Sequence, residues 1–416
     1  MHVMWARYLL SRSKTDHRLC GAFAAVAAAH CTISSSSIVI AEKKKQQNPV
    51  NCSSYGCILL PRDVFYDRKS YEALTQLRSS TPENQAKARL ELSGSGNEDM
   101  ATLTLIGSKG GTGIDVNQDR AFCIAPYMGN QNCRLLGVFD GHARKGHDVS
   151  EHCLQQFPKV LAEKLLDTKL SDDSVEKRKR QICKCLEDTF LHVNLTAPSG
   201  GGCTASVILQ CDSQLFVANA GDSRSFVGIY DASTNKTEVV YISREDKPDL
   251  PDEQARIVQM GGHVHQPLYG VPRVLYYDSV TGSNSGLAMS RAIGDRDATG
   301  VIANPIVQVL DMEELVDTRK FSDTEDDIHI FGVSASDGMM DYIKAEIVAK
   351  VVGEALFSRK KENDEEHPLT ACERLIGLAA KYWEAARHGS YRDDIAITIS
   401  KFRTPPATDD NNNETT

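Results

Sequence analysis

The sequence lacks a long basic stretch, which limits the partners that the protein can have. No basic run is longer than those at Lys43 to Lys45 and Lys177 to Arg180, and the formal net charge of the 416 residues is −9. A surface that binds nucleic acid or an anionic membrane needs a concentration of positive charge. We therefore expect no nucleic-acid partner and interpret the two clusters as solvated surface.

The sequence also lacks a Cys-x-x-Cys motif, although it contains twelve cysteines. The cysteines are scattered, and neither they nor the twelve histidines have the spacing of zinc ligands. A chain of this length can bury a hydrophobic core without disulfide bonds. We expect reduced thiols, a reducing compartment and no structural zinc site.

The apolar stretch at 19–29 is short for a membrane span. We also expect no stable membrane insertion of the folded domain. The apolar stretch lies within residues 1–40, which carry Arg7, Arg12, Lys14 and Arg18 but a single acid, Asp16. This composition is typical of a mitochondrial targeting segment. A disordered extension on a cytoplasmic protein fits residues 1–45 equally well.

The rest of the chain divides into a linker at 46–100, a folded domain at 101–403 and a polar, disordered tail at 404–416. In the domain, period-two runs at 204–211 and 214–220 flank Asp212 and Ser213, and a further run at 224–230 follows a second tight turn. We expect antiparallel hairpins there. Helical spacing appears in three sets: Leu154, Phe157, Leu161 and Leu165; Ile182, Leu186, Phe190 and Val193; Cys372, Leu375, Ala379, Tyr382 and Ala386. The pattern predicts a layered α+β fold.

Aspartate recurs beside apolar strand-like runs at Asp119, Asp140, Asp222, Asp337 and Asp393. One aspartate at a strand end is most often a turn former, but five at the same kind of position indicate carboxylates that meet at one end of a sheet. Such carboxylates repel one another and have raised pKa values unless a cation neutralises them. Oxygen ligands without a thiolate suit Mg²⁺ or Mn²⁺.

Gly141 and His142 directly follow Asp140. A residue without a side chain lets its carbonyl group approach a metal closely, although a turn at a strand end also selects glycine. Histidine beside a metal cluster is a candidate general acid. The alternative is that His142 is an exposed polar residue of an ordinary turn without a catalytic role.

Seven short blocks follow one another along residues 103–402: NQD at 117–119, VFDGH at 138–142, GGCTASV at 201–207, VANAGDSR at 217–224, LAMSRAIGD at 287–295, SASDGMMD at 334–341 and RDDIAI at 392–397. Through these blocks the chain resembles the metal-dependent serine/threonine protein phosphatases of type 2C, above all the plant and protist members. The resemblance implies an α-β-β-α sandwich of two antiparallel sheets flanked by helices. It also implies phosphorylated protein substrates and two Mg²⁺ or Mn²⁺ ions, about 4 Å apart, that hold the attacking water.

The resemblance further implies which residues would hold the ions. Asp140 would bridge them, the Gly141 carbonyl would bind one, and Asp337 and Asp393 would bind the other. Asp119 would lie in or beside the ligand set.

His142 would protonate the leaving serine or threonine oxygen, and a third, weaker metal site would fall on Asp222 and Asp341. We interpret Asp295 as part of a local hydrogen-bonded anchor with Ser290 and Arg291.

One position departs from the family pattern. Many members carry a phosphate-binding basic residue five positions before the aspartate of the first block, and this chain has Ile114 there. We expect the metals, or a residue such as Lys109 or Arg120, to bind the phosphate instead.

Two other functions are compatible with parts of this pattern. An inactive relative could serve as a binding module, but inactive members usually lose metal aspartates, and these are present together with His142. A metal-dependent nuclease would need a basic face, which the acidic balance argues against. We expect an enzyme that is a monomer.

Residues 1–50 fused to a fluorescent reporter are expected to enter an organelle, mitochondria first, because their basic, acid-poor start matches such presequences. Fluorescence microscopy with a mitochondrial marker checks this. A diffuse cytosolic signal would leave the disordered extension as the explanation.

Overall fold

The computed structural model of the protein describes residues 98–109, 116–168, 170, 174–318, 327–357 and 368–403, and the two strand residues Ile58 and Leu59. Residues 1–45, most of the linker and the tail at 404–416 lie outside the described residues, so the predicted domain boundaries stay predictions. The first long strand of the folded part begins at Met100.

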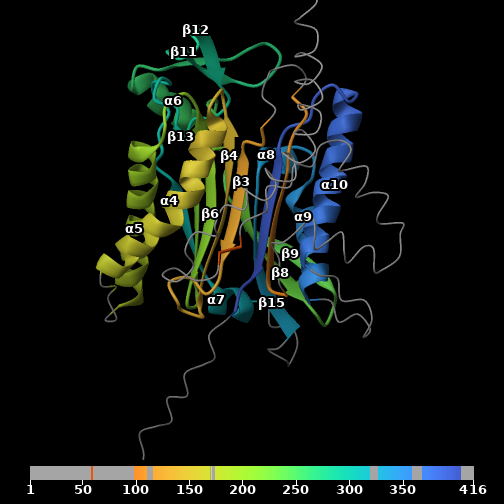
Figure 1. The fold of residues 1–416 in the computed structure, drawn as a ribbon. Helices are drawn as coiled ribbons and strands as arrows, with labels where there is room; N and C mark the ends of the chain where they lie inside the picture. The colour runs from red at the N-terminus through yellow and green to blue at the C-terminus, as the bar shows by residue number, and fades with distance from the viewer. Residues whose placement is uncertain are drawn as a thin grey trace, which may run out of the picture. The chain divides into compact units, whose positions relative to one another are not determined.

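Two antiparallel sheets form the centre of the folded part (Figure 1). The first sheet has the order β1 (Ile58–Leu59), β3 (Asp119–Ile124), β4 (Cys133–His142), β6 (Ala205–Cys211), β7 (Gln214–Ala220) and β14 (Ile306–Asp311), with β5 (Gly202–Cys203) pairing with β4 and β13 (Ile293–Gly294) pairing with β5. The second has the order β2 (Met100–Leu105), β16 (Ile395–Lys401), β15 (Ile328–Ala335), β8 (Arg224–Asp231) and β9 (Lys236–Ile242).

Helices cover the outer face of each sheet. α4 (Gly146–Asp167) and α5 (Val175–Thr196) pack on the first sheet, whereas α9 (Ala345–Phe357) and α10 (Pro368–Arg387) pack on the second (Figure 1). Two shorter helices, α7 (Met312–Asp317) and α8 (Asp337–Met340), follow β14 and β15. The predicted α+β sandwich is confirmed.

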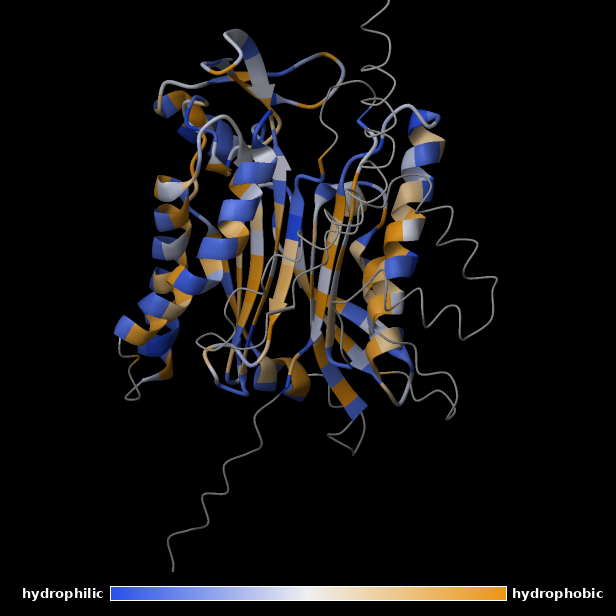
Figure 2. Ribbon diagram, in the orientation of Figure 1, coloured by the Kyte–Doolittle hydropathy of each residue, from blue (hydrophilic) through white to orange (hydrophobic). Residues whose placement is uncertain are grey.

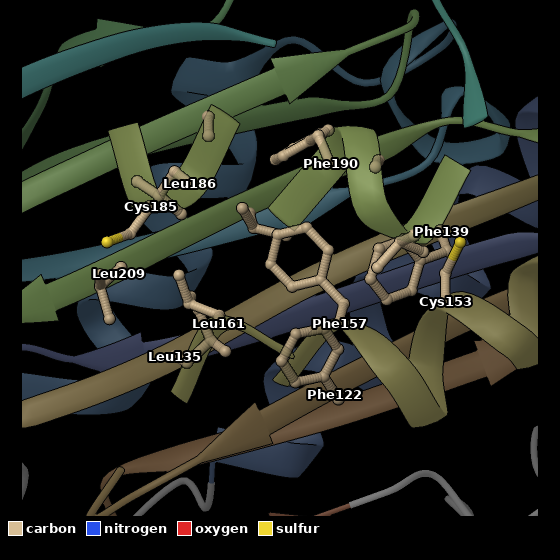
Figure 3. Packing of buried hydrophobic residues seen from close by; sticks show 14 of the residues in the cluster. Phe122, Leu135, Phe139, Cys153, Phe157, Leu161, Cys185, Leu186, Phe190 and Leu209 are labelled. Carbon is tan, nitrogen blue, oxygen red and sulfur yellow. The ribbon is translucent and has the colours of Figure 1, made fainter. Parts of the chain in front are cut away.

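The core explains why these amphipathic elements form layers. Four aromatic rings connect the first sheet to its helices: Phe122 and Phe139 have centroids 5.6 Å apart, Phe139 and Phe157 5.8 Å, and Phe157 and Phe190 5.1 Å (Figure 3). Burial of each such side chain stabilises the fold by about 1.5–3 kcal/mol. Hydrophobic segments, orange in Figure 2, run through the strands of both sheets, and a further buried hydrophobic cluster joins residues of the two sheets.

A small three-stranded sheet lies beyond one end of the sandwich. It consists of β10 (His263–His265), β11 (Arg273–Asp278) and β12 (Ser283–Leu287), preceded by α6 (Pro251–Gln259). The buried carboxylate of Glu253 binds the guanidinium groups of Arg244, Arg256 and Arg291, and this network fixes α6.

Two expectations about local structure were wrong. The turn before β8 does not close a hairpin, because β7 belongs to the first sheet and β8 to the second. In α10, Tyr382 and Ala386 are exposed and Trp383 is buried instead. The indole Nε1 donates a hydrogen bond of 2.6 Å to the Gly338 carbonyl, which turns this side of the helix toward α8.

Candidate active site

Carboxylates from both sheets meet at one end of the sandwich. Asp119 and Asp140 are direct partners across β3 and β4, Asp222 follows β7, Asp337 begins α8 after β15, and Asp393 precedes β16. Burial raises the pKa of Asp140, and the charges of Asp119, Asp393 and Asp222 raise it further. The five acids that the sequence singled out therefore lie together.

Asp337 and Asp341 extend this group toward solvent. Burial raises the pKa of Asp337 well above its usual range, and the charges of Asp140, Asp222, Asp393 and Asp341 add to the effect. Asp341 is exposed at the rim.

Several oxygens in this group have no hydrogen-bond partner. Both carboxylate oxygens of Asp119, a residue that is 1% exposed, and Oδ1 of Asp222 are buried and unpaired. A buried polar atom without a partner costs about 1–3 kcal/mol, and more when it is charged. Hard divalent cations would satisfy these oxygens, so the residues fit a Mg²⁺ or Mn²⁺ centre. Among the described residues, no three acidic, histidine or cysteine side chains already stand in ligand geometry.

Two lysines enter the acid cluster. Lys109 Nζ lies 3.0 Å from Asp393 Oδ1 and 2.9 Å from Asp394 Oδ2, and Lys247 Nζ lies 2.7 Å from Asp222 Oδ2. Burial opposes the charged form of Lys109, but the charges of Asp394 and Asp393 outweigh it and raise its pKa. These ammonium groups supply part of the positive charge that the carboxylates require.

Asp394 was missed by the sequence reasoning. Its carboxylate accepts hydrogen bonds from the backbone N–H groups of Gly107, at 2.6 Å, and Gln118, at 3.0 Å, and it is 2% exposed. It thereby connects the start of β16 to the segments next to β2 and β3. The doubled aspartate before β16 was the available signal.

Gly141 has a packing reason to be glycine. A Cβ atom there would lie 2.6 Å from the carbonyl oxygens of Gln118 and Gly146, closer than real contacts allow. The end of β4 can therefore approach the start of α4. Close approach to a metal is a second reason, which this contact neither requires nor excludes.

His142 pairs with Asp295 and not with solvent. Its Nε2 lies 2.6 Å from Asp295 Oδ2, while Nδ1 is buried without a partner. Burial disfavours the charged ring, but Asp295 outweighs this and raises the pKa of His142. The expected anchor of Asp295 with Ser290 and Arg291 was wrong: Arg291 binds Glu253, and Ser290 binds the Asp246 carbonyl.

The two candidate phosphate-binding residues differ in their surroundings. Arg120 is engaged by Glu151, at 2.7 Å, and by the carbonyl oxygens of Asn117 and Asp119. Lys109 lies in the acid cluster. Ile114 is outside the described residues.

A pocket of about 170 Å³ opens beside the His142–Asp295 pair. Its lining includes Tyr276, Asp278 and Ser279 of the small sheet and Gly200 and Gly201 of the loop before β5. Asp297, also in the lining, accepts hydrogen bonds from the Ser279 N–H and hydroxyl groups.

Acidic side chains that gather at the common end of two sheets, with buried oxygens that lack partners, are typical of a class, the metal-dependent enzymes that use oxygen ligands. The family model described as "Protein phosphatase 2C" matches residues 114–385, more than half of the chain. The chain belongs to the protein phosphatase 2C family, whose members are metal-dependent protein serine/threonine phosphatases. The family expected from the sequence blocks is confirmed.

Individual relatives agree with this membership. The chain is 27% identical over 339 residues to "Probable protein phosphatase 2C 48" of Oryza sativa subsp. japonica, covering 76% of this chain and 87% of the relative. It is 34% identical over 250 residues to "Probable protein phosphatase 2C 61" of Arabidopsis thaliana, covering 58% and 70%. Its fold is similar to the crystal structure of serine-threonine phosphatase 2C from Toxoplasma gondii, with a TM-score of 0.55, 19% identity and coverage of 73% and 95%.

No helix within the described ranges is both long and apolar enough to cross a bilayer.

Lys109→Met is expected to reduce the free energy of unfolding by about 3–5 kcal/mol in EDTA, because it leaves buried Asp394 without its cation. Saturating Mn²⁺ should recover part of this loss. Urea unfolding followed by circular dichroism measures both values. Lys184→Met, which removes the exposed Lys184–Asp188 pair, is the matched control and should change stability little. Equal effects of the two variants would contradict the assigned role of Lys109.

Proposed function

We propose that this chain removes phosphate from phosphoserine and phosphothreonine in proteins by direct attack of water, with two divalent cations held in the acid cluster. The observation that carries the proposal is the convergence of Asp119, Asp140, Asp222, Asp337 and Asp393, with buried oxygens that lack partners. When bound, the cations would neutralise these carboxylates and supply a water that ionises near neutral pH.

Most residues of the acid cluster are proposed as cation ligands. Asp140 and the Gly141 carbonyl would hold the cations from β4, Asp337 and Asp393 would hold them from the second sheet, and Asp119 would support the set from β3. Asp222 and Asp341 would form a third, weaker position, where Lys247 already pairs with Asp222.

His142 is the proposed acid for the leaving oxygen. Its 2.6 Å contact with Asp295 anchors Nε2 and holds one ring orientation, and in our proposal substrate binding brings the leaving oxygen to Nδ1, which is buried and has no partner in the structure. Asp295 is a positioning residue in this scheme. Lys109 is the basic side chain that we propose for contact with the phosphate, because its pairs with Asp393 and Asp394 place it within the acid cluster, whereas Arg120 pairs with Glu151.

The alternative of an inactive binding module has no specific observation in its favour, because the acids and His142 are all present. We propose a monomer, with residues 1–45 directing it to mitochondria.

Activity on a phosphothreonine peptide is expected to require added Mn²⁺ or Mg²⁺ and to be lost in EDTA, because oxygen sites that retain waters bind these ions moderately. Asp337→Asn and Asp140→Asn should each lower turnover at least about 10³-fold with the fold retained, since each removes charge without volume. Phosphate release and circular dichroism measure these effects. Full activity in chelator, or near-normal turnover of either folded variant, would reject the mechanism.

His142→Ala is expected to slow hydrolysis of phosphoserine about 10²- to 10⁴-fold and to affect an aryl phosphate much less. A nitrophenolate leaves without a proton, whereas a serine alkoxide does not. Steady-state kinetics on the two substrates, with Mn²⁺ affinity measured by calorimetry, test this. Equal losses on both substrates would remove His142 from the role of acid.

A further inference from the structure

Two cysteines face each other at the end of β4 and β6 that lies away from the acid cluster. Cys133 is the first residue of β4, Cys211 is the last residue of β6, and they are direct partners in the sheet. Their Sγ atoms are 3.6 Å apart. Both residues are buried, with 1% and 5% of their surface exposed.

The backbone at this pair suits a covalent bond between the sulfur atoms. The N–H and C=O of Cys133 bond to Asn130 and Tyr127, and the Asp212 N–H donates to the Asn132 carbonyl, so the two cysteines occupy a non-hydrogen-bonded position of the ladder. At such positions Cα atoms approach to about 4.5 Å and side chains lie closest. Disulfide bonds need Cα separations of about 4.4–6.8 Å.

The two thiols differ in acidity. The Cys133 thiol donates a hydrogen bond to the Cys211 sulfur, and Arg178 Nη2 lies 3.8 Å from the same sulfur. The hydrogen bond from Cys133, with the charge of Arg178, lowers the pKa of Cys211 against the effects of burial and of the Asp212 carboxylate, which pairs with Arg178 at 2.6 Å. The same hydrogen bond, together with burial, raises the pKa of Cys133. Because the Cys133 thiol donates to the Cys211 sulfur and the Arg178 guanidinium lies beside it, we assign Cys211 as the attacking thiol and Cys133 as its partner.

We propose that Cys133 and Cys211 form a site of reversible oxidation by peroxides, separate from the phosphatase site. The Cys211 thiolate attacks hydrogen peroxide; an S–O bond forms, the O–O bond breaks, and sulfenic acid and hydroxide result. The Cys133 sulfur then attacks Cys211; an S–S bond forms, the S–O bond breaks, and the departing hydroxide takes the Cys133 proton to give water. The two thiols lose two electrons, which the peroxide gains, and a dithiol reductant reverses the change.

A second thiol pair provides an internal comparison. The sulfur atoms of Cys153 in α4 and Cys203 in β5 are nearer, at 3.3 Å, but both residues are 0% exposed. Burial raises the pKa of Cys203 well above its usual range. Distance alone would favour oxidation of Cys153 and Cys203, whereas the guanidinium group beside the Cys211 sulfur favours Cys133 and Cys211.

The position of the site predicts its consequences. Cys133 and Asp140 are seven residues apart on one strand, roughly 23 Å at about 3.3 Å per residue. Oxidation should therefore change phosphatase turnover by less than about twofold. A bond between residues 78 positions apart restricts the unfolded chain, so the oxidised protein should melt several degrees higher.

The test treats the full chain with a small excess of hydrogen peroxide, blocks remaining thiols with iodoacetamide and maps peptides by mass spectrometry without reduction. The expected product is a Cys133–Cys211 crosslink that dithiothreitol removes, with Cys153 and Cys203 still alkylated after unfolding. Arg178→Gln should slow crosslinking several-fold, and Cys153→Ser should leave it unchanged. Cys133→Ser should accumulate a sulfenic acid on Cys211, which dimedone labels.

Three results would overturn the proposal: no Cys133–Cys211 crosslink in the wild-type chain, prior oxidation of Cys153 and Cys203, or loss of phosphatase activity in proportion to the crosslink. The first two results come from the peptide map of the oxidised wild-type chain. They therefore do not depend on whether any variant folds. Because phosphatase activity is measured separately, an inactive chain that still forms the crosslink would contradict the proposed function alone.

Discussion

Mutual repulsion among buried carboxylates is the constraint on which the rest of the structure depends. Two sheets converge so that Asp119, Asp140, Asp222, Asp337 and Asp393 share one end of the sandwich, where burial raises the pKa of three of them, Asp119, Asp140 and Asp337. A fold would not retain such a cluster for stability, because isolated buried charge is costly. Bound cations would lower this cost by neutralising the carboxylates. The repulsion that destabilises the metal-free fold therefore also favours binding of divalent ions.

Close backbone contacts hold the strand ends together against this repulsion. At Gly338 a Cβ atom would lie 1.9 Å from the Asp394 carbonyl oxygen, so α8 can press against the start of β16. The Gly338 carbonyl accepts the Trp383 indole bond, and the Asp394 carboxylate binds the Gly107 and Gln118 amides. The bond from the Trp383 indole is uncharged, and the Asp394 carboxylate receives its hydrogen bonds from backbone N–H groups. The helices that pack on the outer faces of the two sheets support these contacts.

The sequence predicted the features that depend on local pattern. Two of the three helical faces were correct because Phe157 and Phe190, with their neighbours, repeat at helical spacing, and the aspartates were recognised by their position at strand ends. Features that depend on contacts between distant segments were not predicted from the sequence. The crossing from β7 to β8 cannot be distinguished from a hairpin by periodicity, and Trp383 replaces Tyr382 in the core because of a bond to Gly338. Asp394 and the His142–Asp295 pair join segments far apart in the chain, which spacing cannot reveal.

The most direct measurement compares the free energy of unfolding of the wild-type chain and Asp119→Asn, at pH 7, in EDTA and in saturating Mn²⁺. Both Asp119 oxygens are buried and lack a hydrogen-bond partner, and burial raises the pKa of Asp119, so removal of the charge should raise the free energy of unfolding of the metal-free protein. In Mn²⁺ the wild type should gain more than the variant, because its site binds the ion more tightly. A variant that is less stable than wild type in EDTA, or equal gains in Mn²⁺, would contradict the view that cation binding offsets carboxylate repulsion.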